Sequence, residues 1–168
     1  MIIVNRFLPV FSLEQAIKTG DLKLSLPVLS PEWNIKIKFK ITSFLSTQYC
    51  GIMSMQHHFF NVQYGIRTPA ISLNTHTSKI IIASAISGNA NKYFVTPLQL
   101  NTWYDMEVDQ GYVGNGTYRY SIVANGSQIF AIDNTQAVQF YDVGVYAGYR
   151  ASESCIGVIS YLEITNFL

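Results

Sequence analysis

An acidic segment, TrpTyrAspMetGluValAsp, places Asp105, Glu107 and Asp109 at every second position. Residues two apart on a β-strand point to the same face, so a strand here would carry a row of carboxylates that begins beside Trp103. Carboxylate oxygens accept hydrogen bonds from sugar hydroxyls and bind hard cations such as calcium. We therefore predict a ligand-binding stripe at these three residues, with an ordinary solvated strand face as the alternative.

The three histidines of the chain do not have the spacing of a metal site. His57 and His58 are adjacent, and adjacent residues of a strand point to opposite faces, so the two cannot bind one zinc ion together. His76 lies apart from them in a Thr-rich turn. Together with Arg67, the adjacent pair is suited to hydrogen bonding with sugar hydroxyls. The alternative is that these are ordinary strand residues near a sheet edge.

A polar loop, residues 149–154, precedes the last apolar segment of the chain. Loops at the ends of β-sandwiches often carry binding residues, so Tyr149 and Arg150 are further ligand-binding candidates, with a plain connector as the alternative. No serine lies in the strand–turn–helix elbow of a nucleophile. The Gly-rich stretch 111–116 precedes a strand rather than a helix, which excludes a phosphate-binding loop.

The elements that position these residues are predicted to be β-strands. Residues 33–40 (WNIKIKFK) alternate apolar and polar side chains, as a strand with one solvated face does. Asn125-Gly126 separates two strand-like segments and predicts a type I′ hairpin. So many short strands in 168 residues indicate two packed sheets or a barrel. The further strands are predicted over residues 52–56, 58–66, 70–74, 79–86, 92–95, 102–110, 117–124, 128–133, 142–148 and 157–165.

One segment near the N-terminus favours a helix. Ser12 and Gln15 have the spacing of a capping box, and Gly20 supplies a stop signal. We predict a helix of one or two turns, which packs with an N-terminal strand inside residues 1–21.

Composition excludes two classes of partner. Charged residues make up 12% of the chain and the formal net charge is +1, which leaves no basic cluster for nucleic acid. No apolar run reaches the roughly 18 residues of a membrane span. Arg6 and Pro9 interrupt the first apolar run, so it makes a poor signal peptide.

Two Asn-Gly-Ser/Thr sequences, at Asn115 and Asn125, are candidate glycosylation acceptors placed in turns. They favour an extracellular domain excised from a longer chain. The two cysteines, Cys50 and Cys155, allow one intramolecular pairing. A disulfide here would close a long loop and stabilise the fold by roughly 4–5 kcal/mol in the chain-entropy model. Two buried free thiols are the alternative.

Four segments resemble the concanavalin A-like jelly rolls, which include the laminin G-like modules: EWNIKIKFK, LNTWYDMEV, YSIVANGSQIF and VGVYAGYRASESCIGVISYLEI. The resemblance implies one all-β domain over residues 1–168, an antiparallel two-sheet jelly-roll sandwich. MEVDQG is also similar to the catalytic strand of jelly-roll glucanases, Glu-x-Asp-x(-x)-Glu. The final acidic position is missing, since Gln110, Gly111 and Tyr112 follow Asp109. We therefore predict that the protein is not an enzyme.

Low charge, abundant Tyr, Asn and Ser, and the resemblance together predict a non-enzymatic, lectin-like domain that recognises neutral glycans. We expect it in a secreted or cell-surface protein, with no cofactor, and calcium as the alternative. Because single sugar sites bind weakly, we expect a homo-oligomer or a longer multidomain chain. The alternative function is a laminin G-like module for protein interaction and adhesion.

Overall fold

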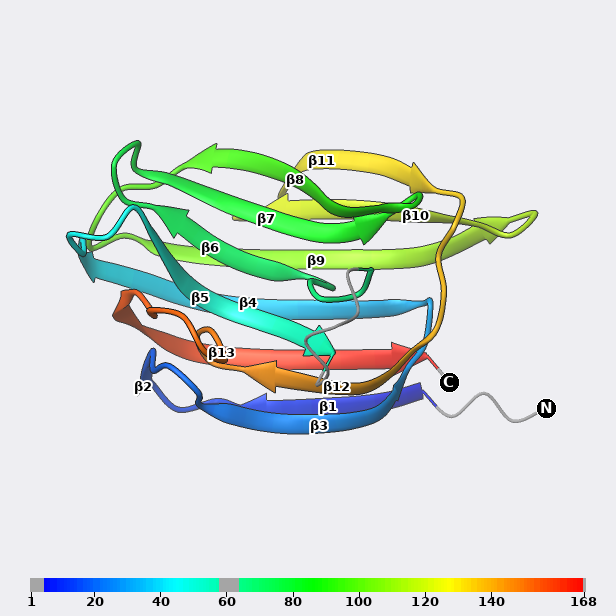
Figure 1. Ribbon diagram of the computed structural model, residues 1–168, viewed down its shortest axis with the longest axis horizontal. Helices are drawn as coiled ribbons and strands as arrows, with labels where there is room; N and C mark the ends of the chain where they lie inside the picture. Colours follow the sequence, from blue (N-terminus) through cyan, green and yellow to red (C-terminus); the bar gives the residue numbers. More distant parts are fainter. Residues whose placement is uncertain (1–4, 58–63, 168) are drawn as a thin grey trace.

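The computed structural model describes residues 5–57 and 64–167, which form two antiparallel sheets packed face to face (Figure 1). The predicted all-β sandwich is therefore confirmed. The strands are β1 (Asn5–Phe11), β2 (Gln15–Ala16), β3 (Leu22–Leu29), β4 (Trp33–Ser43), β5 (Tyr49–His57), β6 (Ala70–Asn74), β7 (Lys79–Ile86), β8 (Asn89–Pro97), β9 (Trp103–Gly114), β10 (Thr117–Ala124), β11 (Ser127–Asn134), β12 (Phe140–Tyr146) and β13 (Ile156–Phe167).

Each sheet combines a run of consecutive strands with strands from both halves of the chain. The seven-stranded sheet has the order β1-β13-β4-β9-β10-β11, and β2 also pairs with β13. The six-stranded sheet has the order β3-β12-β5-β6-β7-β8 and lies in front of the other in Figure 1. The last two strands are thus inserted between early ones: β13 separates β1 from β4, and β12 separates β3 from β5.

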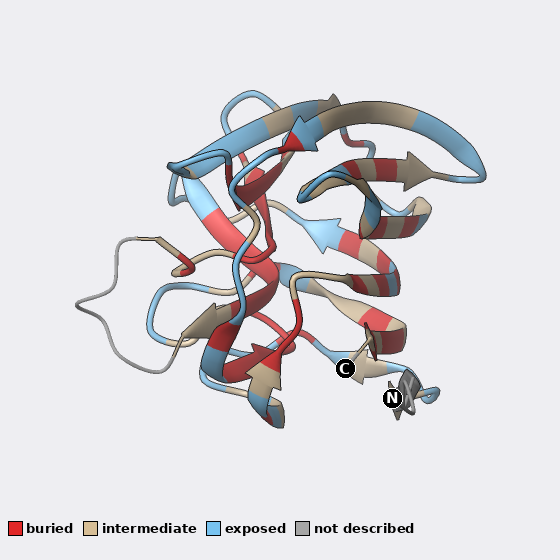
Figure 2. Cartoon of the chain, turned by 90° about the vertical axis from the view of Figure 1, so that its right-hand side faces the viewer, coloured by how far each residue is buried: buried red, intermediate tan, exposed pale blue. Residues whose placement is uncertain are grey.

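Alternation of side chains along the strands builds the core between the sheets. In β4, Trp33, Ile35, Ile37 and Phe39 are buried, whereas Lys36 and Lys38 between them are exposed. Bands of buried and less buried residues alternate in the same way along several strands in Figure 2. On the inner face of the seven-stranded sheet, the Trp33 ring of β4 meets the Tyr120 ring of β10 edge-on, with 6.2 Å between their centroids. Aromatic pairs of this kind add to the stability that burial gives.

The hairpin turns follow the local sequence. Asn125 and Gly126 have φ angles of 50° and 80°, the two positive values that a type I′ turn requires, so the predicted hairpin is confirmed. Asn115 and Gly116 repeat this geometry with φ of 51° and 72°. As a result β9 continues to Gly114, and only two residues of the Gly-rich stretch 111–116 form the turn.

The predicted N-terminal helix is wrong. The described residues contain no helix, and hence none that is long and apolar enough to cross a membrane. Gln15 and Ala16 instead pair with Ile159 and Val158 of β13 as β2. Ile17 is buried at 7% exposure and donates its N–H to the Gly157 carbonyl at 3.1 Å. A helix of one or two turns has little stability of its own, so these tertiary contacts decide the conformation.

The predicted strand over residues 58–66 is also wrong at its end. Residues 58–63 lie outside the described part of the chain, and residues 64–66 form a turn and a bend. Gly65 has a φ of +95°, and a Cβ there would overlap the Phe140 ring. The close approach of that ring therefore requires glycine in a turn conformation, which is incompatible with a strand at residues 64–66.

The two cysteines form a disulfide, so the free-thiol alternative is wrong. Cys50 lies in β5 and Cys155 immediately before β13, with 4.9 Å between their Cα atoms. Two backbone hydrogen bonds flank the bridge: Gly51 donates to the Glu153 carbonyl at 2.8 Å, and Cys155 donates to the Gly51 carbonyl at 2.9 Å. The loop between β12 and β13 is thus fixed against β5.

Candidate functional site

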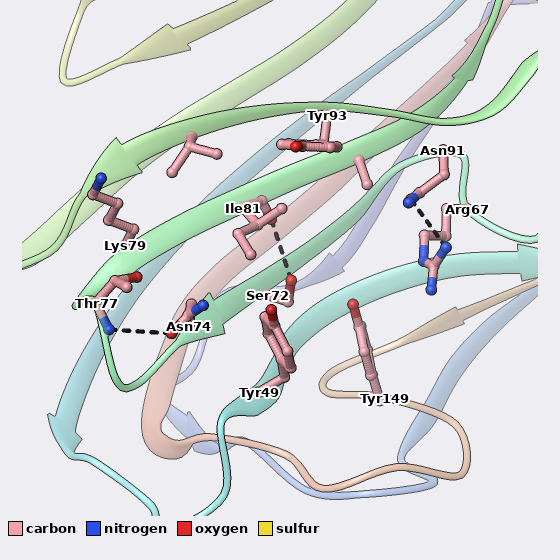
Figure 3. Close-up of a pocket in the computed structure, with 12 residues that line it drawn as sticks. Tyr49, Arg67, Ser72, Asn74, Thr77, Lys79, Ile81, Asn91, Tyr93 and Tyr149 are labelled. Atoms are coloured by element: carbon pink, nitrogen blue, oxygen red, sulfur yellow. Dashed lines mark hydrogen bonds between the residues drawn. The ribbon is translucent and has the colours of Figure 1, made fainter.

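A groove of about 650 Å³ crosses the outer face of the six-stranded sheet (Figure 3). Its volume lies within the range of sites that bind small molecules, about 300–1,000 Å³. Tyr49 and Tyr149 stand along one side, Tyr93 lies on the other, and Arg67 and Lys79 occupy opposite ends. The complete lining is Tyr49, Arg67, Ser72, Asn74, Thr77, Lys79, Ile81, Ala83, Asn91, Tyr93, Val95 and Tyr149.

The floor of the groove follows from strand alternation in β6 and β7. Ile71, Leu73, Ile80 and Ile82 point into the core with 0–1% exposure. The residues that alternate with them must therefore point outward, and three of these line the groove: Ser72 and Ala83, whose side chains are short, and Ile81. The neighbouring edge strand β8 carries Tyr93, which is 61% exposed. Short side chains beside a long one leave the sheet surface hollowed.

The position of the Tyr149 ring, which forms part of one wall of the groove, depends on a glycine beneath it. A Cβ atom at Gly51 would overlap the Tyr149 ring, so the ring can lie on the backbone of β5 only because residue 51 has no side chain. The Tyr149 N–H donates to the Ser154 hydroxyl oxygen at 3.1 Å. The Gly148 carbonyl accepts a hydrogen bond of 3.1 Å from Ser54 in β5. These contacts, with the nearby disulfide, hold the wall in one position.

Arg67 is fixed at the end of the groove where Tyr149 lies (Figure 3). Its Nη1 donates to Asn91 Oδ1 at 3.0 Å, and its carbonyl accepts from the Ala85 N–H of β7 at 3.0 Å. The Asn91 backbone is itself held by the Asn89 side chain at 2.8 Å. A second hollow of about 270 Å³ is also lined by Arg67 and Tyr149. The groove therefore continues past Arg67 toward Ser152.

The acidic stripe (Asp105, Glu107 and Asp109) lies on the outer face of the seven-stranded sheet, opposite the groove. As predicted, the three carboxylates share one face of β9, because Met106 and Val108, which alternate with them along the strand, are fully buried on the other face. Lysines and an amide of β4 stand beside the stripe, because the register pairs Asp105 with Lys38, Glu107 with Lys36 and Asp109 with Asn34. Side chains directly opposite on neighbouring strands interact, so these lysines offset the negative charge.

Two lysines of β4 lie over the Trp103 ring at the start of β9. The Nζ atoms of Lys38 and Lys40 lie 5.8 and 4.6 Å from the centroid of the Trp103 ring. Within the described ranges, no three His, Cys, Asp or Glu side chains lie together in a way that could hold a metal ion. Calcium binding at the stripe stays a prediction.

Folding perturbs the pKa of the Asp109 carboxyl in the stripe. Asn34 Nδ2 donates to both Glu107 Oε1, at 2.5 Å, and Asp109 Oδ1, at 3.2 Å. Burial raises the pKa of Asp109, and the negative charges of Glu107 and Glu32 raise it further, against the Asn34 hydrogen bond. The ionised form of Asp109 is therefore less favourable in the folded protein than in the unfolded chain.

Replacement of Asp109 by Asn should raise the melting temperature at pH 7. A carboxyl whose pKa is raised by folding reduces stability as the pH increases through its unfolded and then its folded pKa. The gain of Asp109→Asn over wild type should thus vanish below the ordinary pKa of 3.8 and be complete near neutrality. Melting curves of both proteins between pH 3 and pH 8 measure this difference. Asp105→Asn is the control, because Asp105 is exposed and faces Lys38; a loss of stability for Asp109→Asn at pH 7 would contradict the argument.

Of the residues predicted to bind ligand, the structure brings Arg67 and Tyr149 together in the groove. His57 ends β5 and Arg150 follows Tyr149, but neither lines it. His58 lies outside the described residues. Sequence reasoning missed seven polar or aromatic residues of the lining, and no signal along the sequence marks them, because they come together only through the pairing of β5, β6, β7 and β8. These residues are Tyr49, Ser72, Asn74, Thr77, Lys79, Asn91 and Tyr93.

No protein-family model matches the chain, and no curated protein sequence does. Solved structures do resemble it. The native heptameric SAP-like pentraxin of Limulus polyphemus has a TM-score of 0.62 and 15% identity, over 94% of this chain and 77% of that chain. The CBM40 of the Ruminococcus gnavus IT-sialidase, bound to α2,3-sialyllactose, has a TM-score of 0.57 and 14% identity, over 92% and 91%. The Ca²⁺-bound exoplasmic/lumenal domain of VIP36 has a TM-score of 0.53 and 11% identity, over 98% and 84%.

All three are lectin-type β-sandwiches. The chain has the concanavalin A-like jelly-roll fold. The predicted resemblance is thereby confirmed at the level of fold, which is all that identities of 15% or less can show. The residues that line the groove are therefore the basis for a proposal about function.

Proposed function

We propose that this jelly roll is a non-enzymatic carbohydrate-binding domain that holds its glycan in the groove on the six-stranded sheet. The observation that carries the proposal is the placement of three tyrosines along the groove. Tyr49 and Tyr149 stand on one side and Tyr93 on the other, with short side chains on the floor between them (Figure 3). Aromatic faces pack against the C–H faces of sugar rings, and their hydroxyls exchange hydrogen bonds with sugar hydroxyls.

Uncharged polar groups make up much of the remaining lining and support a hydroxyl-rich ligand. Asn74, Asn91, Ser72 and Thr77 supply amide and hydroxyl donors and acceptors. Neutral sugar units, as expected from the composition, suit these groups. No Asp or Glu lines the groove among the described residues. The groove lining therefore does not supply the pair of carboxyl groups that ordinary glycoside hydrolysis needs. Binding without hydrolysis fits this chemistry best.

The disulfide supports a secreted or cell-surface location, because such bridges persist in oxidising compartments. In that setting Asn115 and Asn125, both exposed at hairpin tips, are available for glycosylation. An open groove binds a single glycan weakly, so we propose that a homo-oligomer or a longer chain supplies multivalent binding to glycoproteins.

Tyr149→Ala and Tyr93→Ala should each weaken glycan binding about tenfold. Loss of one stacked aromatic ring removes about 0.5–1.5 kcal/mol beyond its buried area, and 1.4 kcal/mol corresponds to a tenfold change in Kd. A glycan array followed by titration calorimetry measures this, with calcium and with a chelator in separate arms. Tyr141→Ala is the matched control, since Tyr141 is 55% exposed and does not line the groove.

The same experiment separates this proposal from the laminin G-like alternative. Saturable glycan binding that is lost in both groove variants and kept in Tyr141→Ala supports a lectin-like domain. An absence of saturable binding in every arm, together with a tight dimer that added sugars do not dissociate, would favour a protein-interaction module.

A further inference from the structure

We propose that the ligand of the groove is an acidic glycan and that Arg67 binds its carboxylate. This inference rests on the proposed function and adds the chemical class of the ligand and the residue that selects it. It departs from the neutral glycan expected from composition. Composition averages the whole surface, whereas a ligand meets only the lining of the groove.

The groove has an unbalanced charge. Its lining contains two cations, Arg67 and Lys79, and no carboxylate among the described residues. Two cations outside the groove do have acidic partners: Lys23 lies 2.8 Å from Asp21, and Arg119 lies 3.0 Å from Asp133. Neither groove cation forms an ion pair within the described part of the chain. The groove is therefore a region of positive potential, which favours anionic ligands.

Arg67 is the better placed of the two cations. Its Nη1 is held by Asn91 Oδ1 at 3.0 Å, so the guanidinium is oriented while further N–H groups of its fork are left to donate. The planar fork matches both oxygens of a carboxylate, and such bidentate pairs are stronger than neutral hydrogen bonds. Lys79, at the opposite end, supplies only a point charge.

The position of Arg67 also fixes where the acidic unit would lie. Arg67 and Tyr149 line both the main groove and the adjoining hollow of about 270 Å³. An acidic sugar bound at Arg67 can thus pack against the Tyr149 ring, which is held over Gly51. The N–H of Ala85 in β7 donates to the Arg67 carbonyl, and Lys79 lies at the other end of the same strand. The length of β7 between Ala85 and Lys79 is about 20 Å, which leaves room for the neutral units of the same glycan.

The test compares two oligosaccharides that differ only in one group: a chain ending in a uronic acid, and its carboxyl-reduced form. Titration calorimetry at low salt should show wild type binding the acidic form at least about tenfold more tightly, with the preference falling as salt increases. Arg67→Gln should abolish the preference, and Arg67→Lys should restore part of it. Lys36→Gln, which removes an exposed cation from the other sheet, is the matched control and should keep the preference.

Separate arms with a sialylated and a sulfated oligosaccharide identify the source of the negative charge. Binding of carboxylated but not sulfated chains, dependent on Arg67, supports the assignment, and exclusive binding of the sulfated chain overturns it. Equal affinity for the acidic and reduced forms, unchanged in Arg67→Gln, would also overturn it while leaving carbohydrate binding intact. If no glycan binds at all, the proposed function itself fails.

Discussion

Removal of the disulfide by Cys50→Ala with Cys155→Ala should lower the free energy of unfolding by about 4–5 kcal/mol. The bridge joins residues 105 apart in sequence, so its loss greatly increases the conformational freedom of the unfolded chain. Urea denaturation of the double variant and of the oxidised wild type measures the difference. Wild type treated with a reductant is the control and should match the double variant. A loss below about 1 kcal/mol would contradict the entropic argument.

The same double variant should bind glycans more weakly even under conditions where it is folded. The loop that carries Tyr149 is held near its far end by the bridge and by the pairing of Gly51 with Glu153 and Cys155. Once the bridge is gone, the Tyr149 ring is less well fixed over Gly51, and ordering it again costs binding free energy. Calorimetry at a temperature well below the melting transition separates this effect from unfolding. Unchanged glycan affinity would show that the backbone hydrogen bonds of Gly51 with Glu153 and Cys155 are enough to fix the Tyr149 ring.

Asn134→Ala should cost about 3 kcal/mol or more of stability. The Asn134 side chain is 1% exposed, and its Nδ2 donates to Gln110 Oε1 at 2.8 Å and to the Ala85 carbonyl at 3.5 Å. Its Oδ1 accepts the N–H groups of Ser87 at 2.9 Å and Gln136 at 3.1 Å. Truncation removes the amide that the buried Gln110 Oε1 and Ala85 carbonyl accept from, at about 1–3 kcal/mol for each group left without a partner.

Chemical denaturation of Asn134→Ala and of Gln128→Ala tests this. Gln128 is an exposed residue of the same strand β11, so its replacement should change stability by no more than about 0.5 kcal/mol. Since Asn134 joins β11 to residues next to β7 in the other sheet, its loss should also lower the cooperativity of unfolding. Equal stabilities of the two variants would show that water replaces the lost amide.

Local patterns predicted those parts of the fold that local contacts determine. The Asn125-Gly126 turn and the shared face of the acidic stripe both depend on a few neighbouring residues, and both were predicted from the sequence. The capping-box signal at Ser12 failed because pairing with β13, more than 140 residues later, outweighs the propensity of one turn of helix.

The site could be predicted only in part, because it depends on which strands become neighbours. Arg67 and Tyr149 were recognised as candidates, but they meet only through the pairing of β12 with β5. The lysines beside the acidic stripe result from the β4–β9 register, which alternation along either strand does not specify. Tyr93 was missed because its role comes from the short residues of β6 and β7 next to it.

The insertion of β12 and β13 between early strands has a consequence for synthesis on the ribosome. Strands β5–β8 and β9–β11 are joined in sequence and can pair as they emerge. By contrast, β3 and β1 have no partner until β12 and β13 follow them, since those two strands supply their pairings. The nascent chain therefore carries unpaired strand edges until its last strands are released, and such edges promote aggregation. Chaperone binding to the early strands during translation is the expected protection against it.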